Sequence, residues 1–208
     1  MFTKQQFTTA ANNVKDLYKK RGLERTWDNK DAFSDAGIKV AWDVYYSVEK
    51  ATANRDFIGM IIGGLRDDTQ PPAEQGSGID PEVKENFWTM NEATKKYGPA
   101  GVLKTANWSV LVNDAWLLAG IHAELKFFLA SPRRQVNVYD TDRNRFRVFG
   151  RELAGLKTFG YQFEPSDWPQ LGEVEVPPIK PQLPTFAEYQ AGVDKYETAK
   201  NYPQLLGP

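Results

Sequence analysis

Apolar side chains recur at helical spacing in the N-terminal half of the chain. Between residues 4 and 21 they repeat every three or four positions, which predicts an amphipathic helix, and Gly22 follows as a residue that typically ends one. The same spacing predicts a second helix from 34 to about 53. A third helix is expected at 55–65, although its three glycines weaken the prediction.

The next segment predicts a loop that is followed by a further helix. Residues 67–78 contain two prolines and two glycines and few apolar side chains, which predicts an exposed loop. Asp80 and Pro81 then provide an N-cap with proline at the first helical position. An apolar stripe continues to Gly98, so a helix is expected over 81–97.

After Gly98 the pattern changes to short apolar runs broken by Asn, Asp, Gly and Pro. Runs of this length favour strands. The stretch 113–131 is ambiguous, because its apolar residues would also line one face of a helix, and strands are preferred there. The runs lie at 108–112, 115–121, 127–130, 136–139, 146–149 and 158–163.

The C-terminal part combines a Pro-rich segment with a last helix. Six prolines between 164 and 184 predict an extended strap, and Thr185 with Glu188 forms a capping box in front of a helix that should run to about Asn201. The expected fold is α+β: a helical N-terminal half packed on a small, mainly antiparallel sheet. One domain at 1–164 is expected, with the strap and terminal helix at 165–208 packed on it.

Composition narrows the classes of protein that the chain can belong to. Aromatic residues make up 13% of the 208, so the core should be rich in rings. The 26 basic and 27 acidic side chains nearly cancel, so no global charge directs the chain to nucleic acid or an anionic membrane. The absence of cysteine excludes disulfides, thiolate zinc sites and cysteine nucleophiles.

Targeting signals are weak in this sequence. The first residues lack the charged and apolar regions of a secretory signal, and no apolar stretch is long enough to span a bilayer. We therefore expect a chain that is cytoplasmic at synthesis, without a membrane span. Export by a route without a cleaved signal is compatible with this expectation.

Four residues are candidates for catalysis. If 113–131 forms strands, His122, Glu124 and Lys126 share one face and could perform general acid–base chemistry. Asp114 with Glu124 and Lys126 also fits the Asp…Glu-x-Lys pattern of metal-dependent nucleases, a pattern that is short and common by chance. The alternative is a half-buried, hydrogen-bonded histidine beside solvated charges. No metal site is predicted, and any cofactor stays unidentified.

A basic segment is the candidate for substrate binding. Between 132 and 157 there are seven basic and three acidic residues. On a strand, Arg143, Arg145 and Arg147 would project from one face, where with Arg151 they could hold phosphates. The alternative is a solvated strand face partly neutralised by nearby aspartates.

Neither the tryptophans nor the familiar sequence motifs identify a function. Trp108, Trp116 and Trp168 could form a platform for a base or sugar, but aromatic residues in apolar runs usually belong to the core. The sequence contains no dinucleotide or phosphate-binding glycine loop, no serine elbow and no His-Glu-x-x-His motif.

Several short blocks within 107–161 carry a resemblance to a class of bacterial proteins. They are Trp108 followed by Asn113-Asp114-Ala-Trp116-Leu-Leu-Ala-Gly120-Ile-His122, then Phe128-Leu-Ala-Ser131-Pro132, Val148-Phe-Gly150-Arg151-Glu152-Leu153 and Gly160-Tyr161. This region resembles the C-terminal effector regions of bacterial polymorphic toxins and secreted competition effectors. The resemblance implies a bacterial protein that acts on, or is exported to, another cell, often with a cognate immunity partner, and it assigns no catalytic residue.

Two hypotheses follow. In the first, the chain is a secreted effector or toxin domain that acts on a phosphate-bearing substrate such as nucleic acid or a nucleotide. Its catalytic residues would be His122, Glu124, Lys126 and Asp114, and the arginines at 143–151 would bind the substrate. In the alternative, the chain is a non-enzymatic interaction protein: an immunity protein, a secretion adaptor or a phage-encoded inhibitor. A protein partner, an immunity protein or secretion component, is expected; nucleic acid is left open, as is whether the chain is an enzyme.

Overall fold

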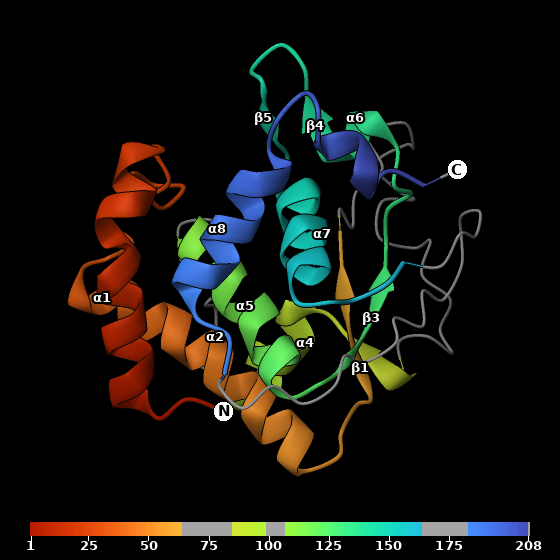
Figure 1. Ribbon diagram of the computed structural model, residues 1–208. Helices are drawn as coiled ribbons and strands as arrows, with labels where there is room; N and C mark the ends of the chain where they lie inside the picture. The colour runs from red at the N-terminus through yellow and green to blue at the C-terminus, as the bar shows by residue number, and fades with distance from the viewer. Residues whose placement is uncertain (64–84, 99–106, 164–182, 208) are drawn as a thin grey trace. The chain divides into compact units, whose positions relative to one another are not determined.

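A computed structural model describes residues 1–63, 85–98, 107–163 and 183–207 of the chain (Figure 1). Contacts between Cα atoms divide the chain into two compact units, each drawn from three stretches of sequence. The first unit comprises Met1–Asp56, Met90–Glu124 and Ile179–Tyr189, and the second comprises Phe57–Thr89, Leu125–Pro178 and Gln190–Pro208.

Helices build the first unit. They are α1 (Lys4–Lys20), α2 (Asp35–Ala53), α4 (Met90–Tyr97), α5 (Val110–His122) and the beginning of α8 (Phe186–Tyr196). Helix α2 packs against α1, α4 and α5 (Figure 1). The predicted helices at 4–21 and 34–53 are confirmed, and so is the helix that follows the capping box of Thr185 and Glu188.

Local sequence sets both ends of α1. The Thr3 side chain accepts a hydrogen bond from the Gln6 amide, and the Gln6 side chain accepts one from the Thr3 amide, which completes a capping box. Gly22 follows the C-cap with φ of +66°, in the left-handed region that glycine adopts without strain. The buried stripe of α1 consists of Phe7, Ala11, Val14 and Tyr18.

Rings fill the core of the first unit, as the composition predicts. The Phe7 ring lies 5.2 Å from that of Tyr45 and 5.3 Å from that of Phe186, measured between centroids. All three side chains are fully buried. Burial of rings of this size is a large source of folding free energy.

Helix α5 corrects the prediction of strands at 108–112 and 115–121. All its residues from Leu111 to His122 are buried, so it is a core helix with no solvated face. A segment that is apolar on every side lacks the 3.6-residue period that marks a helix in sequence. Ser109 caps the helix by accepting a hydrogen bond from the Val112 amide.

A three-stranded parallel sheet belongs to the second unit. Its strands are β1 (Gly59–Ile62), β2 (Phe87–Trp88) and β3 (Lys126–Leu129), in the order β2-β1-β3. Gly59 pairs with Phe87 on one side and with Lys126 on the other. A Cβ at Gly59 would lie 2.6 Å from the Lys126 carbonyl oxygen, so only glycine permits this spacing.

Smaller elements complete the described part of the second unit. Strands β4 (Tyr139–Asp140) and β5 (Arg145–Phe146) form an antiparallel hairpin between α6 (Gln135–Val138) and α7 (Val148–Thr158), and a 3₁₀ helix, η2 (Tyr202–Leu205), lies near the C-terminus. Within α7 the buried Glu152 carboxylate accepts a hydrogen bond from the Gly63 amide at 2.9 Å.

The α+β class is confirmed, and several details differ from the predictions. The larger sheet is parallel, whereas a mainly antiparallel sheet was expected. The predicted helix at 55–65 is wrong because 59–62 is a strand, and the predicted helix at 81–97 is interrupted by β2. Residues 136–138 and 148–149 are helical where strands were expected, as is the start of 158–163.

Three predicted features lie outside the described residues. They are the loop at 67–78, the helix start at Asp80 and Pro81, and all but the last residues of the Pro-rich strap. The proposed division into 1–164 and 165–208 stays a prediction.

Candidate functional site

His122, the only histidine of the chain, ends α5 and is 9% exposed. Its Nε2 lies 2.6 Å from the carbonyl oxygen of Pro184, and its Nδ1 lies 2.7 Å from the hydroxyl of Tyr45. A carbonyl oxygen only accepts, so Nε2 carries the proton and Nδ1 accepts from Tyr45. In this neutral form of the imidazole, both ring nitrogens form a hydrogen bond.

The same network reaches the N-terminus. The Tyr45 hydroxyl accepts a hydrogen bond from the Phe2 amide at 2.6 Å, and the Phe2 ring meets the imidazole edge-on at 4.6 Å. Burial lowers the pKa of His122 to about 4 and raises the pKa of Tyr45, so both side chains are neutral near pH 7. The network joins the N-terminus, α2, the end of α5 and the segment before α8.

The other predicted catalytic residues do not join His122 within the first unit. The Asp114 carboxylate is fully buried and accepts a hydrogen bond from the Tyr18 hydroxyl. It precedes His122 by eight helical residues, a rise of about 12 Å. Glu124 lies beyond the helix end, exposed, with φ of +53°.

Lys126 belongs to the second unit, as the first residue of β3. The common strand face that would align it with His122 and Glu124 is absent, because the helix runs to His122 and the strand begins only at Lys126. The prediction of a shared face is therefore wrong. The catalytic roles assigned to these residues stay predictions.

The predicted row of arginines is divided among different structures of the second unit. Arg151 is buried in α7 and donates a hydrogen bond to Gln190 Oε1 at 2.6 Å. Arg143 lies in the hairpin turn beside Asp140. Arg145 is in β5 and Arg147 is the N-cap of α7, so the three do not form one strand face.

Arg145 and Arg147 nevertheless remain available to a ligand. Both side chains are exposed. Across residues 1–63, 85–98, 107–163 and 183–207, neither guanidinium forms an ion pair or a hydrogen bond. They are the part of the predicted phosphate-binding set whose charge is both accessible and uncompensated.

A tryptophan that the sequence analysis did not single out projects from the first unit. Trp27 is 71% exposed and lies in the loop between α1 and α2. Its ring meets that of Trp108 edge-on at 5.9 Å, and its amide donates to the Trp108 carbonyl at 3.1 Å. We call residues 24–32 the Trp27 loop.

Hydrogen bonds close the Trp27 loop on both sides of the indole. The Thr26 amide donates to the Lys30 carbonyl at 2.8 Å, and the Thr26 hydroxyl donates to Asp28 at 2.6 Å. Arg25 and Asp31 form an antiparallel bridge. The pKa of Asp28 is lowered because Lys30 donates a hydrogen bond to it. The exposed indole therefore stands on a loop with a defined conformation.

Of the three tryptophans considered for a platform, Trp116 is a core residue of α5 and Trp108 is half-buried under Trp27. Trp168 lies outside the described residues. A sequence signal for Trp27 does exist: it is a large aromatic residue within the polar stretch 24–31, where no helical or strand period would bury it.

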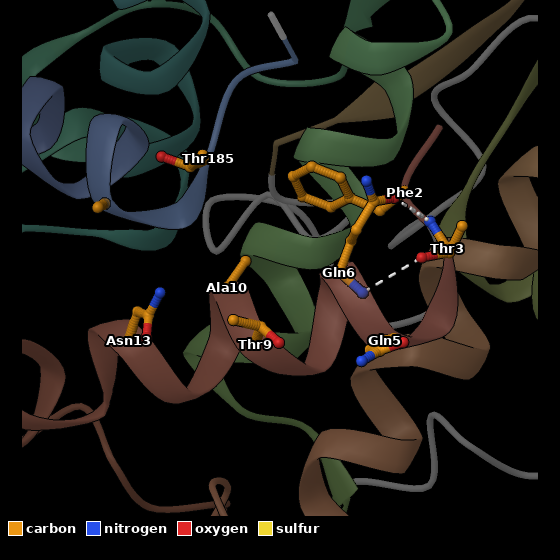
Figure 2. Close-up of a pocket in the computed structure, with 9 residues that line it drawn as sticks. Phe2, Thr3, Gln5, Gln6, Thr9, Ala10, Asn13 and Thr185 are labelled. Carbon is orange, nitrogen blue, oxygen red and sulfur yellow. Dashed lines mark hydrogen bonds between the residues drawn. The ribbon is translucent and has the colours of Figure 1, made fainter.

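A pocket of about 610 Å³ runs along α1 in the first unit (Figure 2). Gln5, Gln6, Thr9, Ala10 and Asn13 line it from the helix, and Thr185 lies across from them. Phe2, Thr3 and Ala187 complete the lining. None of these side chains is charged. We call this pocket the α1 groove.

The described residues also bear on metals and membranes. Among them, no three His, Cys, Asp or Glu side chains gather as a metal site would require. No helix found in the described ranges combines the length and apolarity needed to cross a bilayer.

No protein-family model matches the chain, and comparisons with curated proteins and with solved structures likewise found no match.

Proposed function

We propose that the chain is an interaction protein that binds another protein through the face around Trp27. The observation that carries the proposal is an indole 71% exposed on a closed, hydrogen-bonded loop. Tryptophan is among the residues most enriched at binding hot spots, where truncation to alanine costs about 2 kcal/mol or more. The partner would bury apolar surface that is otherwise left in water.

The conformation of the Trp27 loop supports the same proposal. Ordering a flexible loop on binding consumes part of the binding free energy, and a loop that is already closed avoids that cost. Here the Thr26 and Lys30 backbone bond, the bridge between Arg25 and Asp31 and the packing on Trp108 hold the indole outward. Charged neighbours would form the polar rim around it.

The environment of His122 also favours an interaction protein. His122 is buried, and it forms hydrogen bonds with Tyr45 and Pro184. These contacts give the histidine a structural role in the packing of the first unit. The hypothesis of a secreted toxin with His122 as acid or base stays a prediction, as do export from the cytoplasm and an immunity partner.

Photo-crosslinking from position 27 tests the proposal. The variant Trp27→p-benzoylphenylalanine is expressed in cells that encode the chain, irradiated, and purified under denaturing conditions. We expect one discrete protein adduct, identified by mass spectrometry. The matched control places the same group at Asn12, an exposed position of α1. No adduct at 27, or the same adducts from both positions, would contradict the proposal.

A second candidate function rests on the exposed, unpaired guanidinium groups of Arg145 and Arg147. Such groups bind phosphate through paired donors, which supports binding of a phosphate-bearing ligand such as a nucleic acid. Fluorescence anisotropy with a labelled single-stranded oligonucleotide tests it. Affinity should fall with salt and in the double variant Arg145→Ala/Arg147→Ala, but hardly in Lys200→Ala. Equal affinities of the three proteins would exclude it.

A further inference from the structure

The α1 groove presents unused hydrogen-bonding groups in a regular row. Gln5, Thr9 and Asn13 line it at positions i, i+4 and i+8, so their side chains follow one another along one face of α1. In the described part of the chain, none of the three side chains forms a hydrogen bond. Each can both donate and accept one.

From this row we infer that the α1 groove binds an extended, uncharged polypeptide segment through its main chain. Four helical residues rise about 6 Å, so the row offers a donor–acceptor group every 6 Å. An extended chain turns the same edge of its backbone outward every second residue, which is about 6.6 Å. Over three groups the two repeats differ by about 1 Å, which side-chain rotation can absorb.

The chemistry of the lining selects the class of ligand. A peptide unit has one N–H and one C=O, and amide and hydroxyl side chains satisfy both. With no charged side chain among the nine lining residues, an ionic ligand would lose its hydration without gaining a counter-charge. The small side chains of Ala10 and Ala187 leave room for a backbone to approach.

Capping interactions fix the walls of the groove before any ligand arrives. Gln6 is held by Thr3, and the Thr185 hydroxyl and amide are held by the Glu188 carboxylate at 2.9 and 2.7 Å. Phe2 packs edge-on against His122. These residues shape the groove, which leaves Gln5, Thr9 and Asn13 to contact the ligand.

This inference goes beyond the proposed function, because the groove shares no residue with the Trp27 loop. A neutral sugar is the other ligand that amides and hydroxyls could bind. It lacks the 6.6 Å backbone repeat, and the measurement below separates the two.

The test selects a phage-displayed library of random dodecapeptides on the immobilised full-length protein. Enriched peptides are synthesised, and their affinities are measured by fluorescence polarisation. The triple variant Gln5→Ala/Thr9→Val/Asn13→Ala should bind at least tenfold more weakly, and N-methylation of the peptide backbone should have a similar effect. Asn12→Ala, an exposed neighbour on α1 outside the groove, should bind as the wild type does.

Several outcomes would overturn the inference. One is a selection that yields no peptide; another is a set of peptides that bind the triple variant as tightly as the wild type. Binding of uncharged oligosaccharides on a glycan array, lost in the triple variant, would assign the groove to sugars instead. Trp27→Ala should leave the peptide affinity unchanged, so failure here and failure of the proposed function are distinguishable.

Discussion

Acid should destabilise the first unit through His122. Burial lowers its pKa from an ordinary 6.5 to about 4, so the unfolded chain binds a proton between these pH values that the folded chain does not. The stability is therefore fully present above pH 6.5 and is lost as the pH falls toward 4. Between pH 7.5 and 4.5 the linkage relation gives a loss of about 2 to 3 kcal/mol.

The assay is urea unfolding followed by circular dichroism at pH 7.5, 6, 5 and 4.5. Carboxylates also titrate toward the acid end, and among the groups that act on His122 are the N-terminal amine and Glu188. The informative quantity is therefore the difference from His122→Gln, which has no imidazole to protonate. We expect the wild type to lose about 2 to 3 kcal/mol more than the variant over this range. Parallel loss in both proteins would refute the reasoning.

Three further predictions concern the fold. In urea unfolding at pH 7, Tyr45→Phe should cost about 1 to 3 kcal/mol, because it removes the donor to His122 and the acceptor of the Phe2 amide; an unchanged midpoint would contradict the network. Gly150→Ala should cost about 1 to 3 kcal/mol by thermal unfolding, because a Cβ there would lie 2.1 Å from the Val138 carbonyl oxygen; a stabilised variant would contradict that approach. Thr185→Ala should cost about 1 kcal/mol in the same assay by removing the cap of α8, whereas Thr141→Ala, in the exposed hairpin turn, should not.

The helices that could be predicted from sequence are those with one solvated face. Helices α1, α2 and α8 carry apolar stripes and side-chain caps, and these signals are local. Helix α5 was missed because tertiary packing buries nearly all of it, which removes the period. Strand β1 was missed because four buried residues that begin with glycine have neither strand alternation nor a clear helical repeat.

The candidate sites could be predicted less well than the helices, because their contacts join residues that are far apart in the sequence. A strand at 113–131 would have aligned His122 with Glu124, but the helix ends at the buried His122, and the exposed Glu124 lies beyond it with φ of +53°. The hydrogen bonds from His122 to Tyr45 and Pro184 span 77 and 62 residues of sequence, so no local pattern contains them. Trp27 was visible in principle as a lone aromatic residue in a polar segment.

The most direct test of the proposed function is the affinity of Trp27→Ala for the protein captured from position 27. Isothermal titration calorimetry would compare this variant with the wild type and with Ile58→Ala, another exposed apolar position. A hot spot worth about 2 kcal/mol predicts binding roughly 30-fold weaker for Trp27→Ala, with Ile58→Ala within about threefold of the wild type. Equal affinity of Trp27→Ala and the wild type would contradict the claim that this indole carries the interaction.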